Sequence, residues 1–336
     1  MIPYPLDSLA RFSHKMSFTP VKHLKNPHLQ TIFPLLISRH KLLRLSEEFV
    51  FEDGDFTEVV WSEDPNSKSF EHVSVLFHGL GGSFNSHYIQ NMTRALKEAG
   101  HLCVTMHFRG CGMRNNSSLH SYHAGETNDA KTFIAHLKAR FPQAKLHAVG
   151  YSLGANMLLK LLCTYAHNSP LHSAVAISTP LDLASCTEHL NKGFARVYQR
   201  YLLKDLKAQL FEKSKYLDLE TSLGLSSKRI KAIKTIYEFD DIYTAVANGF
   251  KNAKDYYKQS SSKQFLKYIQ TPTLMLHAKD DPFMPSSVLP TSDELSPMIN
   301  FELSEHGGHV GFIEGTLAHP GFWLEKRVKA FFQENN

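Results

Sequence analysis

The chain has 336 residues, of which 42% are hydrophobic and 21% are charged, a balance typical of a folded globular protein. Lys and Arg number 37 against 32 Asp and Glu, and the resulting formal charge of +5 is spread along the chain. This composition excludes a disordered or fibrous protein and gives no support to nucleic-acid binding, whereas peripheral contact with an anionic membrane surface stays open.

The beginning of the chain and its cysteines indicate a compartment. The stretch MIPYPLDSLARFSHKM lacks the apolar core of about 7–15 residues that a secretory signal has. No apolar run of about 18 residues, the length of a transmembrane segment, occurs anywhere. The four cysteines, Cys103, Cys111, Cys163 and Cys186, show no CxxC spacing and are expected to be free thiols. We therefore expect a cytoplasmic protein without a transmembrane segment.

The elements expected along the chain alternate between strand and helix. An N-terminal extension, about residues 1–45, is expected to pack on the core. Two runs around Gly54, SEEFVFED and FTEVVWSE, predict an antiparallel hairpin. Apolar runs near residues 75, 105, 148, 175, 276 and 302 predict buried strands, with helical stretches between several of them. This alternation predicts an α/β fold with a mostly parallel central sheet and helices on both faces.

One long stretch interrupts the alternation. Between Pro180 and Tyr268 no convincing strand occurs, and Lys, Leu and Tyr recur at helical spacing. We expect a helical cap, about residues 181–268, inserted after the sixth strand. Because neither an internal repeat nor a low-complexity linker is visible, residues 1–336 are expected to form a single domain.

Ser152 lies in the stretch KLHAVGYSLGANMLLKLLCTYA, where a strand meets a long apolar helix. A nucleophile on such a sharp turn needs an unusual backbone angle, and side chains two residues away on either side would collide; Gly150 and Gly154 have none. The following helix directs N–H groups and its positive dipole end toward the serine oxygen. These features predict a nucleophile, and the alternative at this point is a helix N-terminal serine in a glycine-bounded turn.

The loop LFHGLGGSFNSHY follows the third strand. In this architecture that loop supplies one N–H group of an oxyanion hole, and Leu80 is the expected donor. The second donor would be the N–H of Leu153, directly after the nucleophile. The alternative, a phosphate-cradling loop, would need the Lys and Ser/Thr of a P-loop, which are absent here.

Two later loops offer an acid and a base. In PTLMLHAKDDPFMP we choose Asp281 as the acid, because Pro282 keeps its backbone extended, while Asp280 suits a turn-capping role. In SEHGGHVGF the glycine-rich backbone suits His309 as the base, and His306 is interpreted as a surface or supporting group. No HExxH motif or close His/Cys ligand spacing occurs among the 20 histidines, so we expect no metal and no cofactor.

These motifs together resemble those of the YheT-like branch of the α/β-hydrolase superfamily, the AB hydrolase 4 family, over nearly the whole chain. Shared stretches are NPHLQTIFP, HGLGGS, HFRGCG, YHAGETND, GYSLGAN, FDDIYTA, DYY, AKDDPFM and EHGGHVGF. Ala155 departs from the family pattern, in which a second glycine is common there. The resemblance implies a serine hydrolase that cleaves carboxylic esters through a triad of Ser152, Asp281 and His309.

The expected partner is therefore a small-molecule ester, and both lipid-like and short-chain acyl esters stay open. A bulky apolar stripe in the cap could cover an acyl chain, although helix packing explains such stripes more often; it comprises Phe194, Tyr198, Tyr201, Leu202 and Leu203. Two alternatives remain: acyl transfer to an alcohol acceptor, and a non-catalytic ligand-binding protein on the same fold. Four charged residues in the remaining motifs are expected to hold loops and cap contacts, namely Arg109, Asp129, Asp240 and Asp241.

Overall fold

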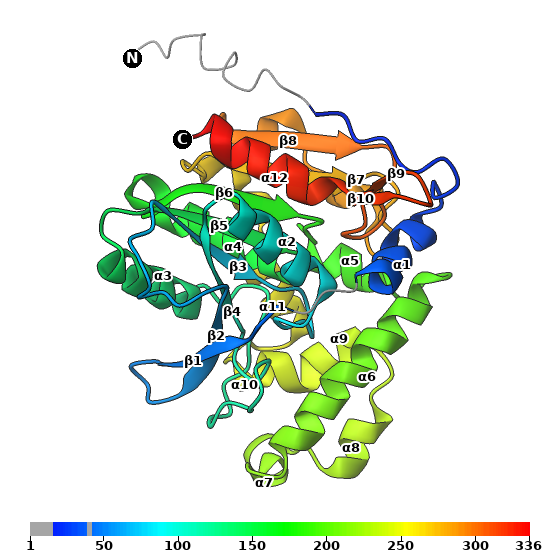
Figure 1. Cartoon of the computed structure of the whole chain (residues 1–336). Coiled ribbons are helices and arrows are strands. Elements are labelled where there is room, and N and C mark those ends of the chain that lie inside the picture. The colour runs from blue at the N-terminus through cyan, green and yellow to red at the C-terminus, as the bar shows by residue number, and fades with distance from the viewer. Residues whose placement is uncertain (1–15, 39–41) are drawn as a thin grey trace, which may run out of the picture.

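An eight-stranded sheet forms the centre of the computed structural model, which describes residues 16–38 and 42–336 (Figure 1). Its strands are β1 (Leu45–Val50), β2 (Phe56–Trp61), β3 (His72–Phe77), β4 (Leu102–Met106), β5 (Lys145–Tyr151), β6 (Leu171–Ile177), β7 (Thr273–Ala278) and β8 (Ile299–Ser304). The order across the sheet is β1-β2-β4-β3-β5-β6-β7-β8. The β1–β2 and β2–β4 pairs are antiparallel, and all other neighbours are parallel. The predicted α/β fold with a mostly parallel sheet is confirmed.

Helices cover both faces of this sheet. On one face, α2 (His87–Glu98) and α12 (Trp323–Glu334) form an apolar cluster with sheet residues such as Leu76 and Val149. On the other face, α3 (Asn128–Arg140) and α4 (Leu153–Tyr165) pack against residues such as Val75 and Ala148. Strands covered on both sides have to be apolar throughout, which is why β4 and β7 are buried along their whole length.

The strand order places one crevice at the end of the sheet. After β3 the chain crosses to β4 on one side, and later returns to place β5 on the other side of β3. Ligands in open α/β sheets bind outside the carboxyl ends of the strands at such a switch point. The loops that follow β3 and β5, with Leu80 and Ser152, therefore meet where a ligand site is expected.

Helices fill the segment between β6 and β7, which we call the cap. They are α5 (Leu183–His189), α6 (Ala195–Lys213), α7 (Leu219–Leu223), α8 (Ser227–Ala232), α9 (Ile236–Phe239), the π-helical turn η3 (Asp240–Thr244), α10 (Ala245–Ala247), α11 (Ala253–Ser260) and the 3-10 helix η4 (Lys263–Tyr268). The longest of them, α6, buries Leu203, Leu206 and Leu210 on one side and projects beyond the sheet (Figure 1). Residues 178–272, all of them described, contain no strand.

The N-terminal extension contains a helix, α1 (Pro27–Ile37), that lies against the C-terminal part of the chain. Asn26 caps it, and the preceding segment bonds to β9 (Ile313–Gly315), which pairs with β10 (Pro320–Phe322). Residues 1–15 of the expected extension lie outside the described part of the chain. No helix in residues 16–38 and 42–336 combines the length and the apolar character needed to cross a bilayer.

Candidate active site

Ser152 lies on a strained turn between β5 and α4. Its φ is +50° and its ψ is −117°, a region that non-glycine residues rarely adopt. Its backbone N–H donates to Ile177 O on β6 at 2.9 Å, which fixes the turn against the sheet. A Cβ atom on Gly154 would lie 2.5 Å from His78 O, and one on Gly150 would lie 2.7 Å from the Cα of Ala155. The steric reason predicted for both glycines is therefore present.

A hydrogen-bonded chain joins Ser152 to His309 and Asp281. The distance from Ser152 Oγ to His309 Nε2 is 3.1 Å, and that from His309 Nδ1 to Asp281 Oδ2 is 2.8 Å. Asp281 is 4% exposed, and its other oxygen accepts the N–H of Phe283 at 2.9 Å. The Phe283 ring stacks on the imidazole with a centroid distance of 4.1 Å. Carboxylate and ring together hold the imidazole so that Nε2 points at the serine oxygen.

Asp280 and His306 form a separate pair beside this chain. His306 Nδ1 lies 3.2 Å from Asp280 Oδ2, and Gly308 N–H donates to Asp280 Oδ1 at 3.0 Å. Asp280 therefore shapes the loop that carries His309, whereas the imidazole of His309 bonds to Asp281. The structure thus gives the two aspartates different partners.

The loop of His309 is held by helix α1, a contact that the sequence did not predict. Thr31 Oγ1 accepts the N–H of His309 at 2.9 Å and donates to Pro27 O at 2.7 Å. Gln30, which is fully buried, accepts the N–H of Ile313 at 2.7 Å and donates to Ile313 O at 3.1 Å. The motif NPHLQTIFP therefore positions the histidine loop, although nothing in its local pattern indicates this contact.

Helix α1 and the loop of His309 are also closely packed at Gly311. A methyl group on Gly311 would collide with the carbonyl oxygen of Gln30. On either side of it, Val310 and Phe312 have φ values of +58° and +49°. The tight approach of helix and loop thus coincides with a strained backbone immediately after His309.

Two backbone N–H groups beside Ser152 have no partner among the described residues. They belong to Leu80 and Leu153, the predicted oxyanion-hole donors. Around Leu80, the N–H of Gly79 donates to Tyr88 Oη at 3.0 Å and that of Gly81 donates to Tyr122 Oη at 3.1 Å. The neighbouring amides are therefore satisfied by tyrosine hydroxyls, which leaves the Leu80 amide available to a ligand.

His78 fixes the start of this loop as a neutral imidazole. Its Nδ1 faces Gly79 O at 2.8 Å, and its Nε2 accepts the N–H of Phe108 at 3.2 Å. Only the tautomer that carries its proton on Nδ1 satisfies both bonds. Burial lowers the pKa of His78 to about 3, so the imidazole stays neutral at any physiological pH.

A cavity of about 790 Å³ opens above Ser152 and His309. Its walls come from the Leu80 loop, the cap and helix α1, and they are mostly apolar; they include Ile32, Leu183, Leu190, Tyr198, Leu202, Ile236, Phe283 and Met284. Tyr198, Tyr201 and Leu202 of the predicted stripe line this cavity, whereas Leu203 is buried in a cap cluster. The volume falls within the usual range for ligand pockets, roughly 300–1,000 Å³.

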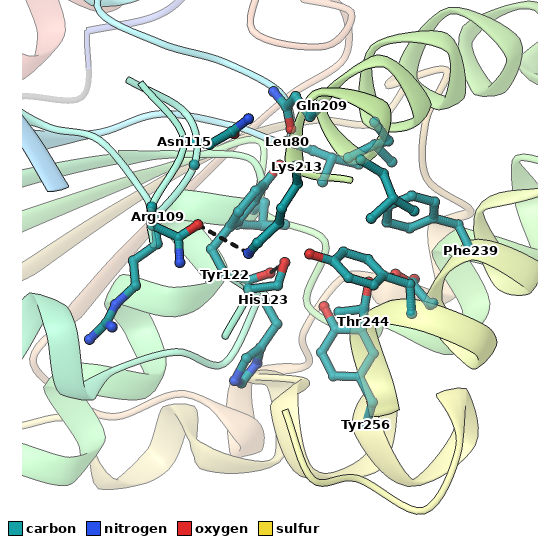
Figure 2. Close-up of a pocket in the computed structure, with 18 residues that line it drawn as sticks. Leu80, Arg109, Asn115, Tyr122, His123, Gln209, Lys213, Phe239, Thr244 and Tyr256 are labelled. Carbon is teal, nitrogen blue, oxygen red and sulfur yellow. Dashed lines mark hydrogen bonds between the residues drawn. The ribbon is translucent and has the colours of Figure 1, made fainter. Parts of the chain in front are cut away.

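A smaller pocket of about 40 Å³, lined by both polar and apolar side chains, lies beside this cavity (Figure 2). The two share Leu80, Leu153, Asp240 and Tyr256 as lining residues. Lys213 of α6 reaches into it and donates to Asn116 Oδ1 at 3.1 Å and to His120 O at 2.9 Å. Burial lowers the pKa of Lys213 to about 8. Both bonds connect the cap to the loop after β4.

The other charged motif residues also hold loops together. Arg109 donates to both oxygens of Asp129 at 2.7 Å and also pairs with Asp53 and Asp55, as the expected loop-holding role requires. Asp240 accepts hydrogen bonds from Tyr257 at 2.6 Å and Thr244 at 2.9 Å within the cap.

Two further sets of contacts involve the cap, one within it and one to the body. Asp241 accepts the N–H of Ala253 at 2.9 Å. Asn156, on the helix after Ser152, donates to Ser260 O at 2.8 Å and accepts the N–H of Ser262 at 3.0 Å. The Asn156 contacts therefore bond the cap directly to the helix that follows the turn of Ser152. In the described ranges, no group of three His, Cys, Asp or Glu side chains is arranged to hold a metal ion.

Comparison with known proteins identifies a matching family, related sequences and a solved structure with the same fold. A family model described as the alpha/beta hydrolase fold matches residues 75–316. The Escherichia coli (strain K12) protein named "Putative esterase YheT" is 44% identical over 318 residues, covering 94% of this chain and 93% of that protein. Human "Phospholipase ABHD3" is 28% identical over 89% of this chain and 74% of that protein. The solved Pyrococcus furiosus esterase Pf2001 shares the fold with a TM-score of 0.55, at 15% identity, over 96% of this chain and 98% of that one.

Proposed function

The chain belongs to the alpha/beta hydrolase fold family, and on this premise we propose that it hydrolyses carboxylic esters with Ser152, His309 and Asp281 as its catalytic triad. The observation that carries the proposal is the hydrogen-bonded chain from Ser152 through His309 to Asp281 at the floor of an apolar cavity. A serine hydroxyl is a poor nucleophile without such a base.

In the first half of the reaction, His309 Nε2 takes the proton of Ser152 while Oγ attacks the ester carbonyl. Asp281 keeps the other ring nitrogen protonated and stabilises the imidazolium that forms. The N–H groups of Leu80 and Leu153 stabilise the oxyanion, and this role is supported by their lack of a hydrogen-bond partner among residues 16–38 and 42–336. The imidazolium then returns its proton to the departing alcohol, and an acyl-enzyme remains.

Water completes the cycle. His309 takes a proton from a water molecule, which attacks the acyl-enzyme carbonyl, and the collapse of the second tetrahedral intermediate returns the proton to Ser152. No metal or cofactor enters any of these steps.

The lining of the cavity favours esters with an apolar acyl group. The wall around Ser152 is built from aliphatic and aromatic side chains of α5, α6 and the loop after β7, for example Leu183, Leu202 and Phe283. Burial of each methylene group in such a wall stabilises the bound ester by about 0.8 kcal/mol. The name of the human relative, a phospholipase, agrees with a lipid-like substrate. We therefore propose that kcat/KM for ester hydrolysis rises with acyl-chain length until the cavity is filled.

Labelling with a fluorophosphonate tests the triad, because this probe reacts with activated serines. We expect a label on Ser152 in the wild-type chain, located by peptide mass mapping, and none in Ser152→Ala or His309→Ala. The same proteins should hydrolyse p-nitrophenyl esters, with a loss on the order of 10⁶-fold in kcat for Ser152→Ala. A folded wild-type chain that neither takes the label nor turns over any ester of the series would refute the proposal. Adding an alcohol and analysing the products separates hydrolysis from acyl transfer.

A further inference from the structure

Large apolar side chains are exposed on α1 and on the first half of α6. The two helices meet near their N-terminal ends (Figure 1), joined by a 2.9 Å hydrogen bond between His28 and Tyr198 and by contact of the His28 and Phe194 rings. The exposed residues are Leu29, Ile32, Leu35 and Leu36 on α1, Val197 and Tyr201 on α6, and Phe194 directly before α6, each between 39% and 68% exposed. We call this surface the apolar rim.

The apolar rim continues into the catalytic cavity. Ile32, Leu35, Val197 and Tyr201 are exposed to solvent and at the same time line the cavity above Ser152. An apolar path thus leads from the outside of the molecule to the serine. Burial in a core does not explain it, since α1 already packs against the body through its opposite face, with Gln30 and Pro34.

Cations flank the apolar rim. Arg196, Arg200 and Lys204 are exposed on the same side of α6, and none of them pairs with an acid in the described part of the chain. Lys22 and Lys25, in the segment before α1, are exposed as well. Apolar and aromatic side chains bordered by Lys and Arg are the composition of surfaces that lie in the interface of an anionic bilayer.

We propose that the apolar rim and its cations bind the surface of an anionic phospholipid membrane, from which an ester enters the catalytic cavity directly. Leu29 and Leu36 would enter the boundary between headgroups and acyl chains, while Arg196, Arg200 and Lys204 contact lipid phosphates. Delivery of the ester rests on the proposed esterase function, whereas binding of the surface does not.

Sedimentation with lipid vesicles tests the binding, using the full chain. Wild-type protein should bind vesicles with about one quarter phosphatidylglycerol better than pure phosphatidylcholine, and high salt should weaken this binding. Leu29→Asp/Leu36→Asp, at two rim residues that do not line the cavity, should lower the partition coefficient at least about 100-fold. The control Val50→Asp, an equally exposed apolar residue on β1, should bind like wild type.

A charge variant tests the same surface without changing α1. Arg196→Gln/Arg200→Gln/Lys204→Gln should weaken binding to the anionic vesicles about 100-fold, at about fivefold for each cation. The control Lys131→Gln lies on α3, on the opposite side of the molecule in Figure 1, and should change little.

Hydrolysis of a water-soluble short-chain ester is measured on every variant. We expect it to stay within about twofold of wild type, while turnover of a long-chain ester embedded in vesicles falls with binding. If wild type binds neither vesicle, if the variants bind like wild type, or if the rim instead holds a dimer that Leu29→Asp/Leu36→Asp dissociates, the surface proposal is wrong. Vesicle binding without turnover of any ester would contradict the esterase function alone.

Discussion

Replacement of Gln30 by Ala should weaken the contact between helix α1 and the segment that follows the histidine loop. The side chain is fully buried and makes three hydrogen bonds, to Leu24 O at 2.8 Å, to Ile313 O at 3.1 Å and from Ile313 N–H at 2.7 Å. After truncation Ile313 O keeps the N–H of Val21 as a donor, but the Ile313 amide is left buried and unpaired. An unsatisfied buried group costs about 1–3 kcal/mol, so we expect a loss of about 2–4 kcal/mol once the cavity is included.

Activity should fall as well, because a shift of about 1 Å in a catalytic group can cost on the order of 100-fold in rate. We expect kcat of Gln30→Ala on a soluble p-nitrophenyl ester to drop roughly 10- to 100-fold with KM little changed, since the mutated side chain does not line the cavity. Denaturant unfolding measures the stability, and Gln333→Ala, an exposed glutamine on α12, is the control. A variant that loses the expected stability yet keeps the wild-type kcat would show that α1 does not set the position of His309.

Three further outcomes follow from the geometry. Asp281→Asn should lower kcat about 10⁴-fold through the wrong imidazole tautomer, whereas Asp280→Asn should lower it less than about tenfold; similar losses in steady-state assays would reverse the assignment. Gly154→Ala should abolish fluorophosphonate labelling or prevent folding, as circular dichroism would reveal, because its Cβ would lie 2.5 Å from a backbone oxygen. Burial lowers the pKa of His147 to about 2, so this side chain binds a proton below about pH 6.5 in the unfolded chain and not in the folded chain; the buried His78 and His101 act in the same direction. Unfolding free energy should fall between about pH 7.5 and 5.5, and denaturant unfolding should show that His147→Gln makes this fall smaller by about 1.4 kcal/mol.

The parts of the structure that follow from local patterns could be predicted from the sequence. Strands covered on both faces need continuous apolar runs, and β3 to β7 coincide with such runs. The prediction of a buried strand near residue 302 was wrong, because β8 lies at the edge of the sheet and only two of its six residues are buried. The turn at Ser152 was visible because its steric needs are met by glycines two residues away. Asp281 and His309 follow strands in short loops, so their position near Ser152 could be inferred from the order of the strands.

The parts that depend on distant contacts could not be predicted. Helix α1 contains an internal proline, Pro34, and its exposed face is apolar, so its pattern does not resemble that of an ordinary surface helix. Gln30 makes bonds that have no local signature, because its partner Ile313 lies 283 residues away. The strands β9 and β10 have three residues each and contain Gly or Pro, which hides them from any periodicity.

The separation of Gln30 and Ile313 along the sequence also affects how the chain folds during its synthesis. Helix α1 leaves the ribosome early, but its partner Ile313 is synthesised 283 residues later. At about 5–20 residues per second, α1 waits roughly 15–60 s before Gln30 can be satisfied. During that time its apolar side chains have no part of the histidine loop to pack against, and the turn of Ser152 forms without His309. With the proposed triad, the nascent chain has no ester-cleaving activity until its last tenth has been synthesised, and during this interval the apolar face of α1 is open to chaperones.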